Sequence, residues 1–335
     1  MSTPIHHGLD LHVGNTPLIR LKRLSELTGC EILGKAEFMN PGGSVKDRAA
    51  WGIITRAEEQ GLLTPGQTIV EGTAGNTGIG LTVIGRARGY RTVIVIPESQ
   101  SPEKIRTLET LGADVITVPV KPYSDPGNYN HIARGLAEKN GWFWANQFDN
   151  IANREAHFRT TGPEIWQATG GNIDAFVASV GTGGTLVGTS LFLKSRRIEV
   201  AAVCADPYGA AIWSWFTHGN LDHDDGDSFA EGIGQGRVTA NLEGFQADAA
   251  YRIDDQTALT IIHHLLEEGL CLGLSSGINI AGAVRYAKEH GPGKTIVTIL
   301  CDSGLKYESK IYNQEWLFDH EFDTDLPIES VLDSI

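Results

Sequence analysis

The order of apolar and polar positions predicts alternating strands and helices in the first half of the chain. Short runs of β-branched and apolar residues, typical of strands buried in a parallel sheet, are followed by longer segments with helical spacing of apolar residues. This alternation is the pattern of βαβ units around a parallel sheet. The predicted strands are 68–70, 92–96 and 114–118, and the predicted helices are 77–88 and 102–111, with Ser101 as the cap of the second helix.

The second half of the chain repeats this alternation and predicts another α/β unit. Segments rich in Gly, Pro, Asn and Asp at 122–130 and 219–227 read as loops. The sequence therefore predicts an α/β protein of two doubly wound domains. The predicted strands of this half are 142–145, 175–179, 200–205 and 295–300, and its predicted helices are 153–166, 256–268 and 280–289.

The composition is typical of a globular enzyme. Of the 335 residues, 41% are hydrophobic, 20% are charged and 40 are glycines, which suits a chain with many tight turns. With 27 basic and 41 acidic residues, the net charge is -14. A surface of this sign repels polyanions, so we expect neither nucleic acid nor an anionic membrane as a partner. Much of the acidic excess lies in the C-terminal tail, which we expect to be solvated or lightly docked.

Neither the cysteines nor the histidines predict a metal site. Cys30, Cys204, Cys271 and Cys301 lack C-x-x-C spacing, and we expect them to be structural and buried. The histidines at 263–264 are adjacent, as are those at 6–7, so neither pair can face one centre from a regular helix or strand. The N-terminus lacks the signal-peptide pattern, and no apolar run reaches about 18 residues. We therefore expect a cytoplasmic location.

A first candidate site is the turn NPGGSVKDR at 40–48, which opens a helix. Ser44 can cap that helix, and Asp47 lies in its first turn, where the helix dipole favours an anion. Lys46 lies in the same turn, where the positive end of the dipole disfavours an ammonium and lowers its pKa. A partly neutral lysine is nucleophilic enough to form an imine with an aldehyde cofactor. Taken alone, Lys46 is better explained as a surface lysine.

Two glycine-containing segments each lie between a predicted strand and a predicted helix. In EGTAGNTG at 71–78, backbone N–H groups and threonine hydroxyls lie at the positive end of a helix, where a carboxylate or phosphate can bind. A tight turn would explain its glycines but not its polar residues. SVGTGGTL at 179–186 lacks the spacing of a Walker loop or a dinucleotide site, which favours a single phosphate. A further segment, CLGLSSG at 271–277, is on its own a helix cap.

Together with GNTPL at 14–18, these segments resemble the cysteine synthase and cystathionine β-synthase family of pyridoxal-phosphate enzymes. The resemblance covers about 13–307, with the motifs in the family's order. It implies fold type II, the tryptophan synthase β-like fold, with pyridoxal 5'-phosphate as the cofactor. The implied units are a smaller, mobile α/β domain at 38–150, a larger α/β domain made of 12–37 and 151–312, and an acidic C-terminal tail at 313–335.

The resemblance also implies the roles of individual residues. Lys46 matches the lysine that forms an imine with the cofactor and later carries the α-proton, and Asn76 matches the residue that hydrogen-bonds the cofactor's 3'-oxygen. Ser275 matches the residue that faces the pyridine nitrogen. A serine there cannot hold that nitrogen protonated as an aspartate would, which favours β-elimination over transamination or racemisation. The implied phosphate loop is Gly181, Thr182, Gly183, Gly184 and Thr185, and the implied substrate-carboxylate site is Thr73, Ala74, Gly75, Asn76, Thr77 and Gln147.

The implied activity is that of a cysteine synthase. O-acetylserine and sulfide give L-cysteine and acetate by β-replacement through an aminoacrylate. Two departures leave an alternative open: Ala74 replaces the usual serine, and LCDSGLKY at 300–307 places a carboxylate where small polar residues are usual. These features resemble the L-cysteine desulfhydrase branch, which converts L-cysteine to pyruvate, ammonia and sulfide. A serine or threonine dehydratase, a nicotinamide dehydrogenase and a non-catalytic regulator are less favoured.

The expected partners also follow from the resemblance. They are a small amino-acid substrate and sulfide, and the family is usually homodimeric. Its active site can bind the C-terminal isoleucine of serine acetyltransferase, but Ala74 lies in the loop that such a peptide would contact. Serine acetyltransferase therefore stays a possible but less favoured partner. The chain itself ends in Ile335, which allows the hypothesis that its tail occupies its own site or a neighbour's.

Overall fold

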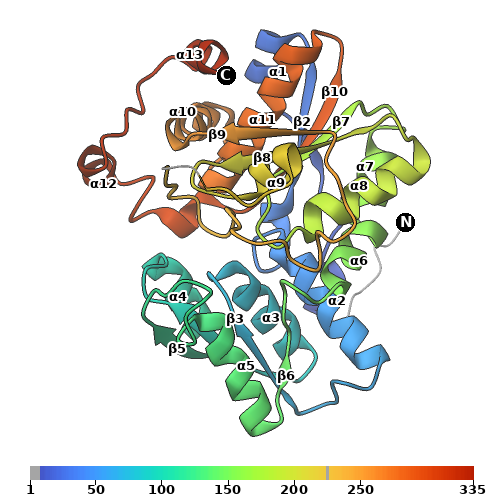
Figure 1. Ribbon diagram of the computed structural model, residues 1–335, viewed down its shortest axis with the longest axis vertical. Helices are drawn as coiled ribbons and strands as arrows, with labels where there is room; N and C mark the ends of the chain where they lie inside the picture. Colours follow the sequence, from blue (N-terminus) through green and yellow to red (C-terminus); the bar gives the residue numbers. More distant parts are fainter. Residues whose placement is uncertain (1–7, 224–225) are drawn as a thin grey trace.

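The computed structural model describes residues 8–223 and 226–335, and its ribbon shows two layered α/β units (Figure 1). In the larger sheet, the first two strands pair antiparallel with each other and all other neighbouring strands are parallel. All residues of its central strands are buried, as expected for a parallel sheet covered on both faces. The strand order is β1 (Leu18–Arg20), β2 (Glu31–Ala36), β10 (Thr295–Leu300), β7 (Ala175–Ala178), β8 (Ala201–Pro207) and β9 (Ala249–Ile253).

The smaller sheet is wholly parallel and comes from one continuous part of the chain. Its central strands are buried at almost every position, whereas the edge strand β5 is largely exposed. The predicted two-sheet α/β architecture is therefore confirmed. The strand order is β5 (Asp114–Val118), β4 (Arg91–Pro97), β3 (Thr68–Gly72) and β6 (Phe143–Trp144).

Helices pack on both faces of the larger sheet because alternate residues of each strand point to opposite faces. On β7, Val177 packs in the cluster of α10 and α11, whereas Phe176 packs in the cluster of α8. The helices are α1 (Lys22–Thr28), α2 (Lys46–Glu59), α3 (Asn76–Ala87), α4 (Pro102–Thr110), α5 (Tyr129–Asn140), α6 (Ala152–Arg159), α7 (Thr161–Ala168), α8 (Gly184–Arg196), α9 (Ile212–His218), α10 (Asp255–Leu265), α11 (Leu274–His290), α12 (Gln314–Asp319) and α13 (Ile328–Ser334). Short 3-10 helices are η1 (Leu9–His12), η2 (Glu37–Met39), η3 (Leu266–Glu268) and η4 (Gly304–Tyr307).

Helix α2 links the two units because it packs against both α3 and α6. A glycine permits its close approach to α6. A Cβ added at Gly52 would lie 2.5 Å from the Cβ of Ala156 and 2.8 Å from the carbonyl oxygen of Ala152. Any larger residue there would separate the helices and shift the start of α2, where Lys46 lies.

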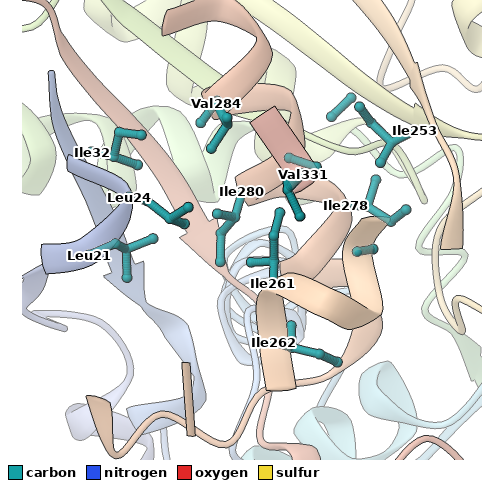
Figure 2. Packing of buried hydrophobic residues seen from close by; sticks show 14 of the residues in the cluster. Leu21, Leu24, Ile32, Ile253, Ile261, Ile262, Ile278, Ile280, Val284 and Val331 are labelled. Atoms are coloured by element: carbon teal, nitrogen blue, oxygen red, sulfur yellow. The ribbon is translucent and has the colours of Figure 1, made fainter. Parts of the chain in front are cut away.

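The acidic tail docks on the larger unit. Ile328 and Val331 of α13 are buried in the same cluster as α10 and α11, and Figure 2 shows Val331 beside Ile261 and Ile280. The carbonyl oxygen of Ile335 accepts a hydrogen bond of 2.9 Å from Lys288. Ile335 therefore does not occupy the chain's own site, because burial of the neighbouring apolar residues holds the end of the tail against α10 and α11. Its placement in a neighbour's site stays a hypothesis.

Three local predictions are also corrected. The predicted helix 153–166 is two helices, because Pro163 cannot donate a backbone hydrogen bond and its ring clashes with the carbonyl four residues earlier. Ser101 is the N-cap residue of α4 as predicted, although its side chain makes no capping hydrogen bond. Ser44 lies one residue before the actual N-cap of α2, Val45, and its hydroxyl accepts from the backbone N–H of Lys46 over 3.3 Å. The predicted helix 280–289 is the end of α11, which begins at Leu274 and therefore includes Ser275.

The cysteine prediction holds with one exception. All four cysteines are free; Cys30, Cys204 and Cys301 are buried, whereas Cys271 is half-buried. Within residues 8–223 and 226–335, no group of three or more His, Cys, Asp or Glu side chains could hold a metal ion. None of the helices described is long and apolar enough to cross a membrane.

Candidate active site

A cavity of about 690 Å³ opens where the loops after β3 and β7 meet the first turns of α2 and α11. Ligands of parallel sheets bind at this position, outside the carboxyl ends of the strands. Gly183 and Thr185 line a small adjoining pocket that shares Lys46 with the cavity. Gly75 and Gly184 shape the two loops without lining either space. The predicted residues that line the cavity are Lys46, Thr73, Ala74, Asn76, Thr77, Gln147, Gly181, Thr182 and Ser275.

Lys46 is the first residue of α2, and its amine faces the cavity. The backbone N–H of Val45 donates to the carbonyl oxygen of Cys301 over 2.9 Å, which ties the turn to the segment after β10. Desolvation by the surrounding protein lowers the pKa of Lys46 below its ordinary value, against the opposing effect of Asp302. The side chain makes no hydrogen bond or ion pair within the described part of the chain. Lys46 is therefore poised as a nucleophile or base.

The loop between β7 and α8 is shaped by close backbone contacts. A Cβ added at Gly181 would lie 2.2 Å from the carbonyl oxygen of Gly232, and Gly183 has φ of 87°. The loop ends at the N-terminus of α8, where backbone N–H groups and the helix dipole favour an anion. Thr182 accepts a 2.8 Å hydrogen bond from Asn153, which orients its side chain. The donor set and the cramped glycine loop fit a phosphate group.

A neutral histidine supports the end of this loop. His157 is buried, with its Nε2 3.1 Å from the Thr185 hydroxyl and its Nδ1 2.8 Å from the Thr161 hydroxyl. Desolvation and the nearby Arg48 guanidinium lower the pKa of His157 to about 3. The ring is therefore uncharged near neutral pH and orients Thr185 by hydrogen bonding alone.

The loop between β3 and α3 depends on side-chain hydrogen bonds. The Thr77 hydroxyl donates to Gln147 Oε1 over 2.5 Å, and Gln147 Nε2 donates to the carbonyl oxygen of Gly72 over 3.2 Å. Glu71 accepts from the backbone N–H groups of Asn146 and Gln147 over 2.7 and 3.1 Å. These contacts leave the Thr73 and Asn76 side chains on the cavity wall beside the methyl group of Ala74.

Ser275 lies in the first turn of α11, buried on the cavity wall. Its neighbour is the thiol of Cys301, which also lines the cavity. Burial raises the pKa of Cys301 to about 11, against the opposing effect of the Lys46 ammonium. The thiol is therefore protonated at neutral pH. Ser275 and Cys301 give this wall uncharged polar groups.

Sequence reasoning missed an ion-pair group that also lines the cavity. Glu231 accepts from Lys104 of α4 and from Lys310, each over 2.7 Å. Burial alone would raise the pKa of Glu231, but the two ammonium groups bring it below its ordinary value. The group joins α4, beside the smaller sheet, to the larger unit across the cavity. Lys104 and Glu231 are 127 positions apart, and no motif marks either one.

A second missed group adjoins Asn76. Its amide nitrogen donates to Asp302 over 2.7 Å, and its amide oxygen accepts from Lys306 over 3.0 Å. Tyr307 also donates to Asp302 over 2.7 Å. The only signal in the sequence was the unusual carboxylate within 300–307.

A desolvated lysine amine beside a phosphate-sized glycine loop is the arrangement that a pyridoxal-phosphate enzyme requires. A family model described as pyridoxal-phosphate dependent enzyme matches residues 9–302, and the chain belongs to this family. Pyridoxal phosphate is therefore its cofactor, and the predicted fold type II is confirmed.

The more specific resemblance is confirmed by individual relatives. The chain is 52% identical over 319 residues to cysteine synthase 1 of Neurospora crassa, a match that covers 93% of this chain and 85% of the relative. It is 46% identical over 330 residues to cysteine synthase of Dictyostelium discoideum, covering 95% and 87%. The crystal structure of O-ureido-L-serine synthase superposes with a TM-score of 0.85 at 36% identity and covers 98% of this chain and 100% of that one.

Proposed function

We propose that the protein is a cysteine synthase, which joins sulfide to O-acetylserine and releases acetate. The observation that carries this proposal is Lys46, whose amine has no hydrogen-bond or ion-pair partner among the described residues and faces a cavity bounded by a phosphate-sized loop. The identity of up to 52% to cysteine synthases over most of the chain supports this reaction among those of the family.

The cavity offers a place for each part of the cofactor. The phosphate would bind at Gly181, Thr182, Gly183, Gly184 and Thr185, and Lys46 would hold the aldehyde carbon. Asn76 would hydrogen-bond the ring oxygen and Ser275 would face the ring nitrogen. Bound pyridoxal phosphate supplies an electron sink that stabilises negative charge at the substrate's α-carbon.

The chain's own groups then control the proton and the substrate. Lys46, with its lowered pKa, takes the α-proton as a base, and this proton transfer contributes about 10²–10⁴-fold to the rate. The C–O bond to acetate at the β-carbon then breaks, hydrosulfide forms the new C–S bond there, and Lys46 returns the proton to the α-carbon. The substrate carboxylate would bind to the loop of Thr73, Ala74, Gly75, Asn76 and Thr77, together with Gln147.

The competing reaction is the desulfhydrase one, in which water consumes the intermediate. The ion pairs between Lys104, Glu231 and Lys310 join the two units across the cavity and favour exclusion of water. The deciding experiment compares cysteine formation from O-acetylserine and sulfide with pyruvate release from L-cysteine by one preparation. We expect fast cysteine formation with little pyruvate. Sustained pyruvate release at a comparable rate would overturn the synthase assignment.

The oligomeric state, the mobile unit and the cellular location are also proposals. We propose a homodimer whose mobile unit is 38–150, a range that contains the whole smaller sheet. Light scattering during size-exclusion chromatography tests the dimer. The four free cysteines suit a reducing compartment such as the cytoplasm.

A further inference from the structure

Asn76 lies between a buried carboxylate and an ammonium group. Its Nδ2 donates to Asp302 Oδ2 over 2.7 Å, and its Oδ1 accepts from Lys306 Nζ over 3.0 Å. A carboxylate can only accept and an ammonium can only donate. Rotation of the amide by 180° would place oxygen against the carboxylate and N–H against the ammonium. Both neighbours therefore select the same amide orientation.

This orientation leaves one hydrogen-bond donor toward the cavity. An amide NH₂ group carries two hydrogens, and only one is used by Asp302. Asn76 lines the cavity, so its second N–H is available to an acceptor there. The inverted amide would instead present an oxygen atom, which would repel the ring oxygen of the cofactor.

Asp302 is itself held by the segments that carry the other site residues. Its carbonyl oxygen accepts from the backbone N–H of Gly273 over 3.1 Å, two residues before Ser275, and it forms a bridge with Ser44, two residues before Lys46. Asp302 is fully buried, so its charge is little screened by solvent. Its second oxygen, Oδ1, has no hydrogen-bond partner in the described part of the chain.

Lys306 is equally constrained. Its ammonium donates to the carbonyl oxygens of Gly42 and Gly43, each over 3.0 Å, besides Asn76. These three contacts account for all three ammonium hydrogens. The side chain thereby connects the turn before Lys46 to the loop that carries Asn76.

We propose that Asp302 and Lys306 are positioning residues that fix the amide of Asn76 so that it donates to the cofactor's ring oxygen. This inference rests on the proposed role of Asn76 in the site. Asp302 and Lys306 act through Asn76 and do not themselves touch the reacting atoms. Asp302 also acts on the pKa of Lys46 through its charge, and Lys306 also bonds the turn before Lys46. Only the part of their effect that runs through the amide must therefore disappear when Asn76 has none.

The test compares purified holoenzymes with Asp302→Asn, Lys306→Met and Asn76→Ala, singly and with each of the first two combined with the third. We expect Asp302→Asn to change the ratio of the two main absorption bands of the bound cofactor by about twofold or more, and to lower kcat by about tenfold. Lys306→Met should change both in the same direction but less. In the Asn76→Ala background, each substitution should change the spectrum less than it does alone.

Matched variants separate this role from a general structural one. Asp114→Asn removes a carboxylate from an exposed ion pair on β5 and should leave the spectrum unchanged. Tyr307→Phe removes the hydroxyl that donates to Asp302 besides Asn76. If Asp302→Asn fails to fold, Tyr307→Phe and Lys306→Met together test the same carboxylate. The inference would be overturned if Asp302→Asn and Lys306→Met each kept the wild-type spectrum. It would also be overturned if the spectral effect of either substitution were fully additive with that of Asn76→Ala. A wild-type enzyme without a visible cofactor band would instead overturn the proposed site.

Discussion

The two loops that bound the cavity are built on different principles. The loop after β7 is built from glycine backbone that leaves no room for side chains, because a Cβ at Gly181 would lie 2.2 Å from the carbonyl oxygen of Gly232 and one at Gly184 would lie 2.2 Å from the side-chain oxygen of Asn153. The loop after β3 is shaped by distant side chains, with Thr77 bonded to Gln147 and Asn76 bonded to Asp302. The residues of the phosphate loop can therefore be recognised from a short stretch of sequence. The side-chain contacts of the substrate loop form only when the whole chain has folded.

Lys46 lies between the two loops, and its loss should have the largest effect. We expect Lys46→Ala to lower kcat/KM about 1,000-fold or more, because both a covalent attachment and a base are removed. The visible band of the bound cofactor should shift as well. Lys139→Ala, at an exposed position near the end of α5, is the matched control and should behave as wild type. More than a tenth of wild-type activity in Lys46→Ala would contradict the assigned role.

The backbone-built loop should respond to one added methyl group. Gly181→Ala places a Cβ 2.2 Å from the carbonyl oxygen of Gly232, so the loop must move. A displacement of about 1 Å can cost about 100-fold in a positioned site, and we expect a loss of that order in cofactor affinity. Spectroscopic titration of the apoprotein with pyridoxal phosphate measures it. A Cβ added by Gly135→Ala in α5 meets no neighbour within 4 Å among the residues that the structure describes, so this variant should leave the affinity unchanged. Equal affinities in the two variants would contradict the close-packed loop.

The side-chain-built loop should lose substrate affinity while it keeps the cofactor. Gln147→Ala leaves the Thr77 hydroxyl and the carbonyl oxygen of Gly72 without their partner. We expect KM for O-acetylserine to rise roughly tenfold, the effect of about one lost hydrogen bond to a charged group. The cofactor spectrum should stay that of wild type. Gln167→Ala, exposed on α7, is the control. A large loss of cofactor affinity would show that the two loops are not separable.

The same distinction explains how far the sequence alone could go. The loop after β7 could be predicted because its strand, glycines and helix start lie within 175–185. Lys46 could be proposed from its helical first turn and from the family resemblance. Asp302 and Asn76 are 226 positions apart, so their contact depends on the order of the strands in space. Local patterns carry no information on that order.

Some elements of the fold were missed for a related reason. Strand β2 contains Gly34 and Lys35, which lower the strand signal, yet Lys35 is buried and paired with Glu164 over 2.7 Å. Strand β9 mixes polar and apolar residues without clear alternation. In both strands tertiary pairing outweighs local preference, and only the assembled sheet shows it.

The smallest predicted effect concerns the histidine that supports the backbone-built loop. Burial lowers the pKa of His157 to about 3, so the folded protein binds fewer protons than the unfolded chain between about pH 3 and 6.5. Stability must then fall as the pH decreases from 6.5. At pH 5.5 this group alone should cost about 1 kcal/mol relative to pH 7.5.

His157→Gln removes the titrating ring while it retains a side chain that can hydrogen-bond Thr185. We expect its free energy of unfolding to decrease about 1 kcal/mol less than that of wild type between pH 7.5 and 5.5. Urea denaturation of the apoprotein at the two pH values measures this difference. His131→Gln provides the control, because His131 lies away from this loop on α5, where its Nε2 is 2.6 Å from the carbonyl oxygen of Tyr123. If His157→Gln kept the wild-type slope, His157 in the folded state would have to gain its proton over the same pH range as in the unfolded chain, and it would be charged at pH 5.5. Its ring could not then accept from the Thr185 hydroxyl, and the loop would be supported by a charge rather than by a neutral hydrogen-bonding group.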